Sequence, residues 1–138
     1  MRKRGKPLTA LPADLFIKWR SRLQKPNPES RKLNMNFIFI YITNPTEREA
    51  RKIATFLLRK KLIACANIFP IDSLYWWEDK IVQEKEFVLI AKTKKENFQK
   101  VKREVENIHS YEIPCIVKIP VSSNEKYYKW IKKEVKIN

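Results

Sequence analysis

The chain has 138 residues, of which 43% are hydrophobic and 12% aromatic, a composition that suits one folded domain with a core. Its net charge is +15, yet no RNP motif, zinc-finger spacing or glycine-rich loop accompanies the charge. The single glycine is Gly5, which excludes Walker and dinucleotide-binding loops from the rest of the chain. We therefore expect a solvated, lysine-rich surface, with neither a nucleic-acid partner nor a membrane span.

Residues 1–34 form a basic extension that holds 10 basic and only 2 acidic side chains. Within it, a proline-flanked segment from 12 to 23 places apolar residues near helical spacing among Lys and Arg, as in a basic amphipathic helix. We expect the extension to be disordered, or to be translated sequence upstream of the true start. The alternative is an organelle-targeting presequence. The folded domain is predicted to comprise residues 35–138.

The first half of that domain predicts a strand, a helix and a long hairpin. Residues 37–43 are a continuous apolar, β-prone run. Asn44 is expected to cap the following helix, with Glu47 returning a hydrogen bond to the cap. A second strand over 63–78 is expected to be an edge strand because it contains Pro70. A turn at 78–80 then leads into a third strand.

The second half predicts a helix, a strand and a final helix. The third strand ends at 87–93, and Thr93 with Glu96 resembles a capping box that opens the next helix. A fourth strand is predicted over 114–121, and Ser122 to Glu125 is expected to open a last helix with Trp130 facing inward. The order β-α-β-β-α-β plus a C-terminal helix predicts an α+β, ferredoxin-like fold, in which two helices cover one face of an antiparallel sheet.

The first strand is apolar on both of its faces. Phe37, Phe39 and Tyr41 point to one side of the sheet, and the isoleucines between them point to the other. An antiparallel strand with one wet face should instead alternate apolar and polar residues. A subunit interface would explain the second apolar face. It would also explain the adjacent Trp76 and Trp77, which point to opposite faces of their strand. The alternative is that the extension or the last helix covers this face.

Four blocks of residues then carry a family resemblance. They are 62–71 (LIACANIFPI), 73–78 (SLYWWE), 109–114 (HSYEIP) and 128–130 (YKW), and in this order they resemble the CutA family. The resemblance implies a ferredoxin-like subunit, a tight homotrimer, and divalent-cation tolerance with copper binding. A PII-like signalling or scaffold trimer that binds a small molecule or protein is the alternative. The chain departs from the family pattern at Asp79-Lys80, Ser110 and Ser123.

The candidate metal ligands are His109, Cys65 and Glu112. Imidazole suits copper and zinc, and a thiolate at Cys65 suits Cu(I) or zinc. The competing interpretations are a helix-end role for His109, core packing for Cys65, and a lysine partner for Glu112. The resemblance places Trp76, Trp77, Glu78 and Tyr111 at the subunit interface, while Cys115 is taken as structural.

No enzymatic role is expected. A Cys–His pair is conceivable as nucleophile and base, but nothing in the sequence orients the base and no oxyanion-forming turn is visible. The two cysteines form no CxxC motif, which favours a reducing compartment, and we expect the protein to be cytoplasmic.

Overall fold

The computed structural model describes residues 12–23 and 37–136, and the chain divides into two units, Met1–Leu33 and Asn34–Asn138. In the first unit, α1 (Ala13–Leu23) is a helix whose Leu15 and Ile17 side chains are exposed. None of the described helices is long and apolar enough to cross a membrane. The expectation that the extension is disordered or a presequence concerns mainly residues outside the described ranges.

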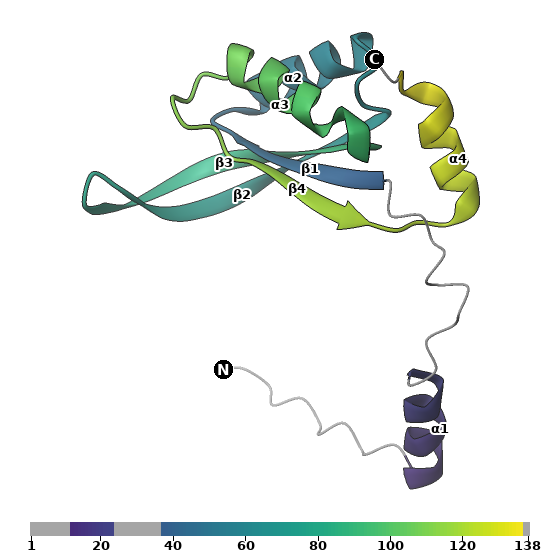
Figure 1. Cartoon of the computed structure of the whole chain (residues 1–138). Coiled ribbons are helices and arrows are strands. Elements are labelled where there is room, and N and C mark those ends of the chain that lie inside the picture. The colour runs from purple at the N-terminus through teal and green to yellow at the C-terminus, as the bar shows by residue number, and fades with distance from the viewer. Residues whose placement is uncertain (1–11, 24–36, 137–138) are drawn as a thin grey trace. The chain divides into compact units, whose positions relative to one another are not determined.

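The second unit has the element order predicted from the sequence (Figure 1). Its elements are β1 (Phe37–Asn44), α2 (Glu47–Arg59), β2 (Cys65–Trp77), β3 (Lys80–Lys94), a 3-10 turn (Lys95–Asn97), α3 (Phe98–Ile108), β4 (Ile116–Val121) and α4 (Glu125–Glu134). The four strands form one sheet in the order β2-β3-β1-β4, and every neighbouring pair is antiparallel. The predicted antiparallel sheet is therefore confirmed.

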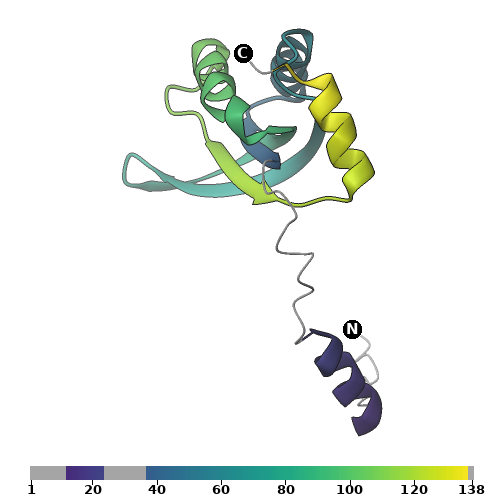
Figure 2. The same cartoon turned by 45° about the vertical axis from the view of Figure 1, so that its right-hand side comes forward.

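Helices α2 and α3 lie side by side on one face of the sheet (Figures 1 and 2). The core between these layers takes Ile38, Ile40 and Ile42 from β1, all of them at most 1% exposed. Each isoleucine buried in this way contributes about 1.5–3 kcal/mol relative to an exposed one. The helices supply the opposing side chains: Ala50, Ile53, Ala54 and Leu57 from α2, and Val101 and Val105 from α3.

Helix α4 lies at one end of the sheet, where Ile131 and Val135 pack against Phe37 in a second cluster. The prediction that Trp130 faces inward is wrong, because its side chain is 41% exposed. Trp130 directly precedes the buried Ile131, so it lies about 100° away around the helix. Its ring stacks at a tilt on Tyr127, with 5.5 Å between the centroids.

The helix starts differ from those predicted. Thr46, not Asn44, caps α2, and its Oγ1 accepts a hydrogen bond from the Glu49 N–H at 3.1 Å. Asn44 remains in β1, and its amide donates to the carbonyls of Ile42 and Phe87, at 3.2 and 3.1 Å. The buried amide thus joins β1 to β3, a contact that no local sequence pattern predicts.

Thr93 also belongs to a strand and not to a capping box. Its hydroxyl donates to the Leu62 carbonyl at 2.6 Å and accepts from the Asn97 amide at 3.1 Å. Helix α3 follows the 3-10 turn without a side-chain cap. In α4 the cap is Asn124, whose Oδ1 accepts from the Tyr127 N–H at 2.8 Å, so the predicted helix start at Ser122 is two residues early.

Strands β2 and β3 form a long hairpin that extends beyond the layer of helices (Figure 1). Its register is unbroken from the Cys65–Lys92 pair to the Trp77–Lys80 pair. Pro70 lies in β2, an edge strand as predicted, and Pro120 lies in β4, the other edge strand. The two turn residues, Glu78 and Asp79, have φ of 46° and 60°, as in a type I′ turn.

Candidate functional site

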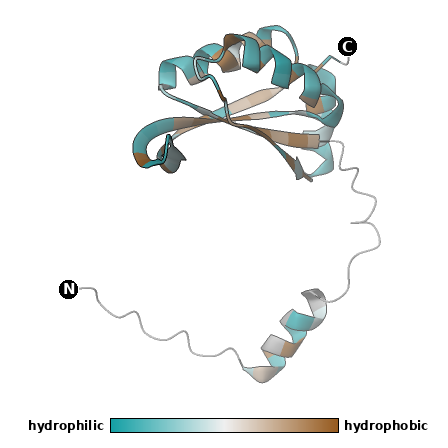
Figure 3. Ribbon diagram, turned by 60° about the vertical axis from the view of Figure 1, so that its left-hand side comes forward, coloured by the Kyte–Doolittle hydropathy of each residue, from teal (hydrophilic) through white to brown (hydrophobic). Residues whose placement is uncertain are grey.

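The sheet face opposite α2 and α3 carries large exposed apolar side chains. Residues that alternate with the core isoleucines of β1 share this second face. Four of the large apolar side chains here are between 38 and 47% exposed: Phe69, Trp77, Val117 and Ile119. In Figure 3 the hydrophobic colour lies mainly in the central part of the sheet, and most residues of the helices have the hydrophilic colour. Helix α4 covers only the end of this face near Phe37 and Phe39, where Tyr127 packs.

A groove with a volume of about 840 Å³ opens on the second face, between the β2–β3 hairpin and the segment that follows α3. Its walls combine aromatic rings with carboxyl groups. The aromatic residues are Tyr41, Tyr75, Trp77 and Tyr111, and the acidic residues are Asp72, Glu84, Glu86 and Glu112. Thr43, Ile71, Ser110, Ile113 and Cys115 are among the other lining residues.

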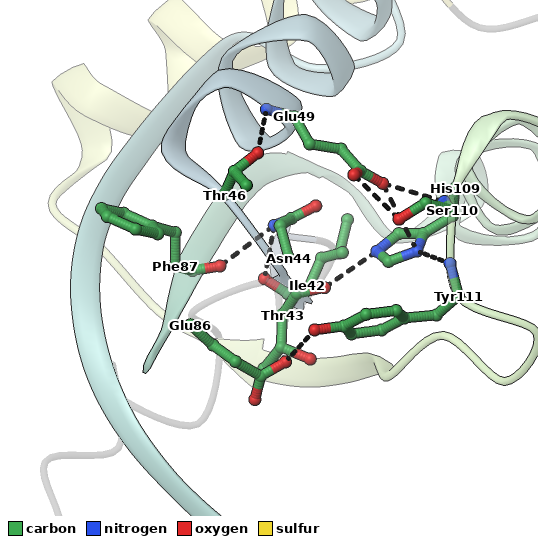
Figure 4. A network of polar contacts seen from close by, with 10 residues as sticks. All are labelled: Ile42, Thr43, Asn44, Thr46, Glu49, Glu86, Phe87, His109, Ser110 and Tyr111. Carbon is green, nitrogen blue, oxygen red and sulfur yellow. Dashed lines mark hydrogen bonds and ion pairs between the residues drawn. The ribbon is translucent and has the colours of Figure 1, made fainter. Parts of the chain in front are cut away.

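His109 anchors the segment that borders this groove, and both of its ring nitrogens are engaged (Figure 4). Nε2 lies 2.9 Å from the Thr43 carbonyl, to which it donates, and Nδ1 accepts the Tyr111 N–H at 3.0 Å. These two bonds require the neutral imidazole with its proton on Nε2. The side chain is fully buried. To coordinate a metal ion, His109 would have to give up one of these bonds.

Glu49 holds the same segment from helix α2. Its carboxylate accepts from the N–H and the hydroxyl of Ser110, both at 2.8 Å, and Oε1 lies 3.7 Å from His109 Nδ1. Ser110 thus supplies two donors to this carboxylate, its N–H and its hydroxyl. The loop is therefore tied to α2 by hydrogen bonds.

Two tyrosines hold two carboxylates in the groove. Tyr111 donates its hydroxyl to Glu86 Oε1 at 2.9 Å, and Tyr75 donates to Glu84 Oε2 at 2.6 Å. Burial, reinforced by the bond to Glu86, raises the pKa of Tyr111, while the bond to Glu84 raises the pKa of Tyr75 to about 12. Both phenols therefore remain donors at neutral pH. Sequence reasoning missed Glu84 and Glu86, because acidic residues two apart in a strand also suit a solvent-exposed face.

Cys115 lies beside this pair of carboxylates. Although Cys115 is exposed overall, partial burial of its thiol raises the pKa, and the negative charge of Glu86 raises it further, against a smaller opposing effect of a hydrogen bond with Thr43. The side chain lines the groove. A thiol with a raised pKa is a poor metal ligand and a poor nucleophile at neutral pH.

The three candidate metal ligands do not come together within one chain. Positions along β3 show how far apart Cys65 and His109 are. Cys65 lies opposite Lys92 of β3. His109 binds the carbonyl of Thr43, and Thr43 lies opposite Val88 of β3. Four residues of strand separate these positions, or about 13 Å. Glu112 is exposed at the rim of the groove. Among residues 12–23 and 37–136, no group of three or more His, Cys, Asp or Glu side chains is arranged to hold a metal ion.

The candidate interface residues occupy different surroundings. Trp77 and Tyr111 line the groove. Trp76 is 71% exposed and points to the opposite side of the hairpin from Trp77. Glu78 occupies the hairpin turn. Trp77 and Tyr111 therefore border the same groove on the second face, whereas Trp76 and Glu78 do not line it.

Comparison with known proteins identifies the family. The family model described as CutA1 divalent ion tolerance protein matches residues 38–134. The chain belongs to the CutA1 family. The match runs from the second residue of β1 to the end of α4, so nearly the whole folded unit has its counterpart in the family.

Individual relatives agree with this assignment. The CutA1-family protein from Archaeoglobus fulgidus named divalent-cation tolerance protein CutA is 51% identical over 98 residues, which cover 70% of this chain and 96% of that protein. A solved structure described as the periplasmic divalent cation tolerance protein CutA from the same organism is 48% identical, with a TM-score of 0.71, and covers 72% of this chain and 99% of that one. The rice protein CutA 1, chloroplastic, is 34% identical, over 75% of this chain and 60% of that protein. These CutA1 relatives give no support to the alternative of a PII-like trimer.

Proposed function

We propose that this chain is a homotrimeric, non-enzymatic protein that binds copper or a similar divalent metal ion weakly, at positions shared between subunits. The observation that supports this most directly is the uncovered apolar face of a single chain, in a family named for divalent ion tolerance.

The exposed second face favours association. Phe69 and Trp77 of β2 and Val117 of β4 all expose large apolar side chains on this face. Covering several such side chains contributes several kcal/mol, at about 25 cal/mol per Å² of apolar surface. Large apolar side chains exposed on one face of a sheet favour an interaction site there. A ring of three copies with a three-fold axis would cover the face of every subunit and leave none open.

The ligand chemistry also favours sites between subunits. Zinc sites in proteins take three or four protein ligands, and no such set of His, Cys, Asp or Glu occurs among the described residues of one chain. Among the described residues, neither the Cys65 thiol nor the Glu112 carboxylate takes part in an ion pair, while His109 is held by two hydrogen bonds. A neighbouring copy would have to supply the remaining ligands, which is consistent with weak binding.

Light scattering on the purified chain tests the assembly. The expected mass is three times the chain mass of 16.6 kDa. The variant Ile119→Lys should lower the mass, because it places a charge on the second face. Leu58→Lys is a matched control, since Leu58 of α2 is also 38% exposed but lies on the helical layer. A wild-type mass of one chain at micromolar concentration would refute the trimer.

Equilibrium dialysis against Cu²⁺ and Zn²⁺ tests the ligands. Cys65→Ser and Glu112→Gln should each reduce the number of ions bound per chain, and Cys115→Ser should not. His109→Gln tests the third candidate and is read together with circular dichroism, because His109 also holds the loop. Unchanged stoichiometry in the Cys65, Glu112 and His109 variants would remove all three from the site.

We further propose a cytoplasmic location, with organelle targeting by residues 1–34 as the alternative. The rice relative is named chloroplastic and the archaeal structure is described as periplasmic, so family members are not confined to one compartment. Fluorescent fusions with and without residues 1–34 separate the two. Import that depends on residues 1–34 would contradict the cytoplasmic location.

A further inference from the structure

Helix α1 has an apolar side that its sequence defines. Its first turn is closed by the Leu15 N–H, which donates to the Pro12 carbonyl at 2.9 Å, and Asp14 in that turn favours the helix start. At about 100° per residue, positions 15, 16, 19 and 23 fall within about 100° of one another around the helix. We call these four residues the apolar stripe: Leu15, Phe16, Trp19 and Leu23.

The apolar stripe is at least partly uncovered. Leu15, on the stripe, is 50% exposed, and Ile17, on the other side of the helix, is 65% exposed. Lys18 and Arg20 are exposed as well. Because an amphipathic helix gains most of its stability when its apolar side is covered, α1 is expected to have a partner for this stripe.

The charge around α1 indicates which partner fits. Residues 1–34 carry 10 basic and only 2 acidic side chains. The family match begins at residue 38, so this charge lies outside the part of the chain that the family shares. Arginines flank the stripe, since position 20 lies about 40° beyond position 16 and position 22 lies about 20° before position 15. A complementary partner therefore offers an apolar layer beneath a negatively charged surface.

A bilayer that contains anionic lipids has both of these properties. Basic amphipathic helices with Leu, Phe and Trp on one face lie in the interface of such membranes, and the negative surface potential attracts their Lys and Arg side chains. The 11-residue helix α1 is about 16 Å long, whereas the hydrocarbon core of a bilayer is about 30 Å thick. A helix of this length lies on a bilayer and does not span it.

We propose that α1 docks this protein on the surface of an anionic lipid bilayer, with the apolar stripe toward the acyl chains and the basic residues among the headgroups. The cytoplasmic leaflet is negatively charged, so docking there is compatible with the proposed cytoplasmic location. The inference uses none of the candidate metal ligands and none of the exposed side chains of the sheet. It is therefore independent of the proposed trimer and of the proposed metal site.

Co-sedimentation of the purified full chain with vesicles tests the inference. The chain should bind vesicles of phosphatidylcholine mixed with phosphatidylserine, and should bind pure phosphatidylcholine at least about tenfold more weakly. Leu15→Glu and Trp19→Glu should each weaken binding to the mixed vesicles at least about thirtyfold, because each loses apolar contact and adds a negative charge.

Ile17→Glu is the matched control. It makes the same change of charge at an exposed apolar residue outside the stripe, so it should weaken binding no more than about fivefold. All three variants should keep the mass of the wild type in light scattering, because α1 is not part of the folded unit that would form the trimer.

Several results would overturn the inference. Equal losses in Leu15→Glu and Ile17→Glu would mean that charge alone attracts the chain to the vesicles, as the lysines of the folded unit would. Equal binding to both kinds of vesicle would remove the anionic lipid from the proposal. Absence of vesicle binding by the wild type would assign the stripe to another partner, and to the folded unit where Leu15→Glu also changes the mass in light scattering. Failure of the trimer or of Cu²⁺ binding leaves the inference intact, so the proposals fail separately.

Discussion

His109 donates its Nε2 proton to the carbonyl of Thr43 at 2.9 Å and thereby joins the end of α3 to the end of β1. The same ring accepts the Tyr111 N–H. His109→Ala should lower the free energy of unfolding by about 2–4 kcal/mol, because a buried carbonyl and an N–H lose their partners. Urea unfolding at fixed protein concentration measures it. Asn107→Ala, exposed on the same helix, should stay within about 0.5 kcal/mol of the wild type.

The caps of α4 give a second prediction. Asn124→Ala should destabilise the protein by about 1 kcal/mol, because the Tyr127 N–H loses its acceptor. Ser122→Ala, two residues earlier, should have almost no effect on the same urea unfolding curve. Equal losses in the two variants would contradict the helix start that the structure shows.

The hairpin turn gives a third prediction. Glu78 and Asp79 both have positive φ, a conformation that disfavours most residues other than Gly, Asn and Asp. Replacing them together by Asn-Gly should raise the midpoint of thermal unfolding, with a gain of about 1 kcal/mol in stability. Glycine placed one residue later, in Lys80→Gly, should destabilise instead, because Lys80 begins β3.

Stability should fall at alkaline pH in a way that depends on two tyrosines. Their ordinary pKa is 10.0, and the folded protein raises the pKa of Tyr75 to about 12 and raises that of Tyr111 as well. A tyrosine whose pKa is raised by folding adds its full contribution to the free energy of unfolding below pH 10. That contribution is lost as the pH rises from 10 through the pKa of the tyrosine in the folded protein. A Tyr75→Phe, Tyr111→Phe variant should therefore lose less stability than the wild type between pH 10 and 12, measured by urea unfolding.

The thiol of Cys115 gives a fifth prediction. Burial and the charge of Glu86 raise its pKa, so in a Cys65→Ala background its alkylation by iodoacetamide should accelerate only at a pH above that of an ordinary thiol. Glu86→Gln should move this profile to lower pH. Glu84→Gln should leave it in place, and an equal shift in both variants would contradict the assignment to Glu86.

The sequence predicted the architecture but only part of the site. Apolar runs and alternation predict the four strands, and the structure confirms each of them within a few residues. They also predict that β1 is apolar on both faces. The capping predictions at Asn44 and Thr93 were wrong because tertiary hydrogen bonds, to Phe87 and to Leu62, occupy those side chains. The groove was not predicted, since the contacts of Tyr75 with Glu84 and of Tyr111 with Glu86 depend on strand register and on a loop path that local patterns do not encode.

The prolines of the two outer strands limit how copies of this protein can add to one another. Pro70 in β2 and Pro120 in β4 lack the N–H that an incoming strand would need at those points. An additional strand that paired along either edge would meet a missing donor, so indefinite growth of the four-stranded sheet into a fibril is disfavoured. Chains that associate through their apolar second faces are therefore expected to form closed oligomers of finite size.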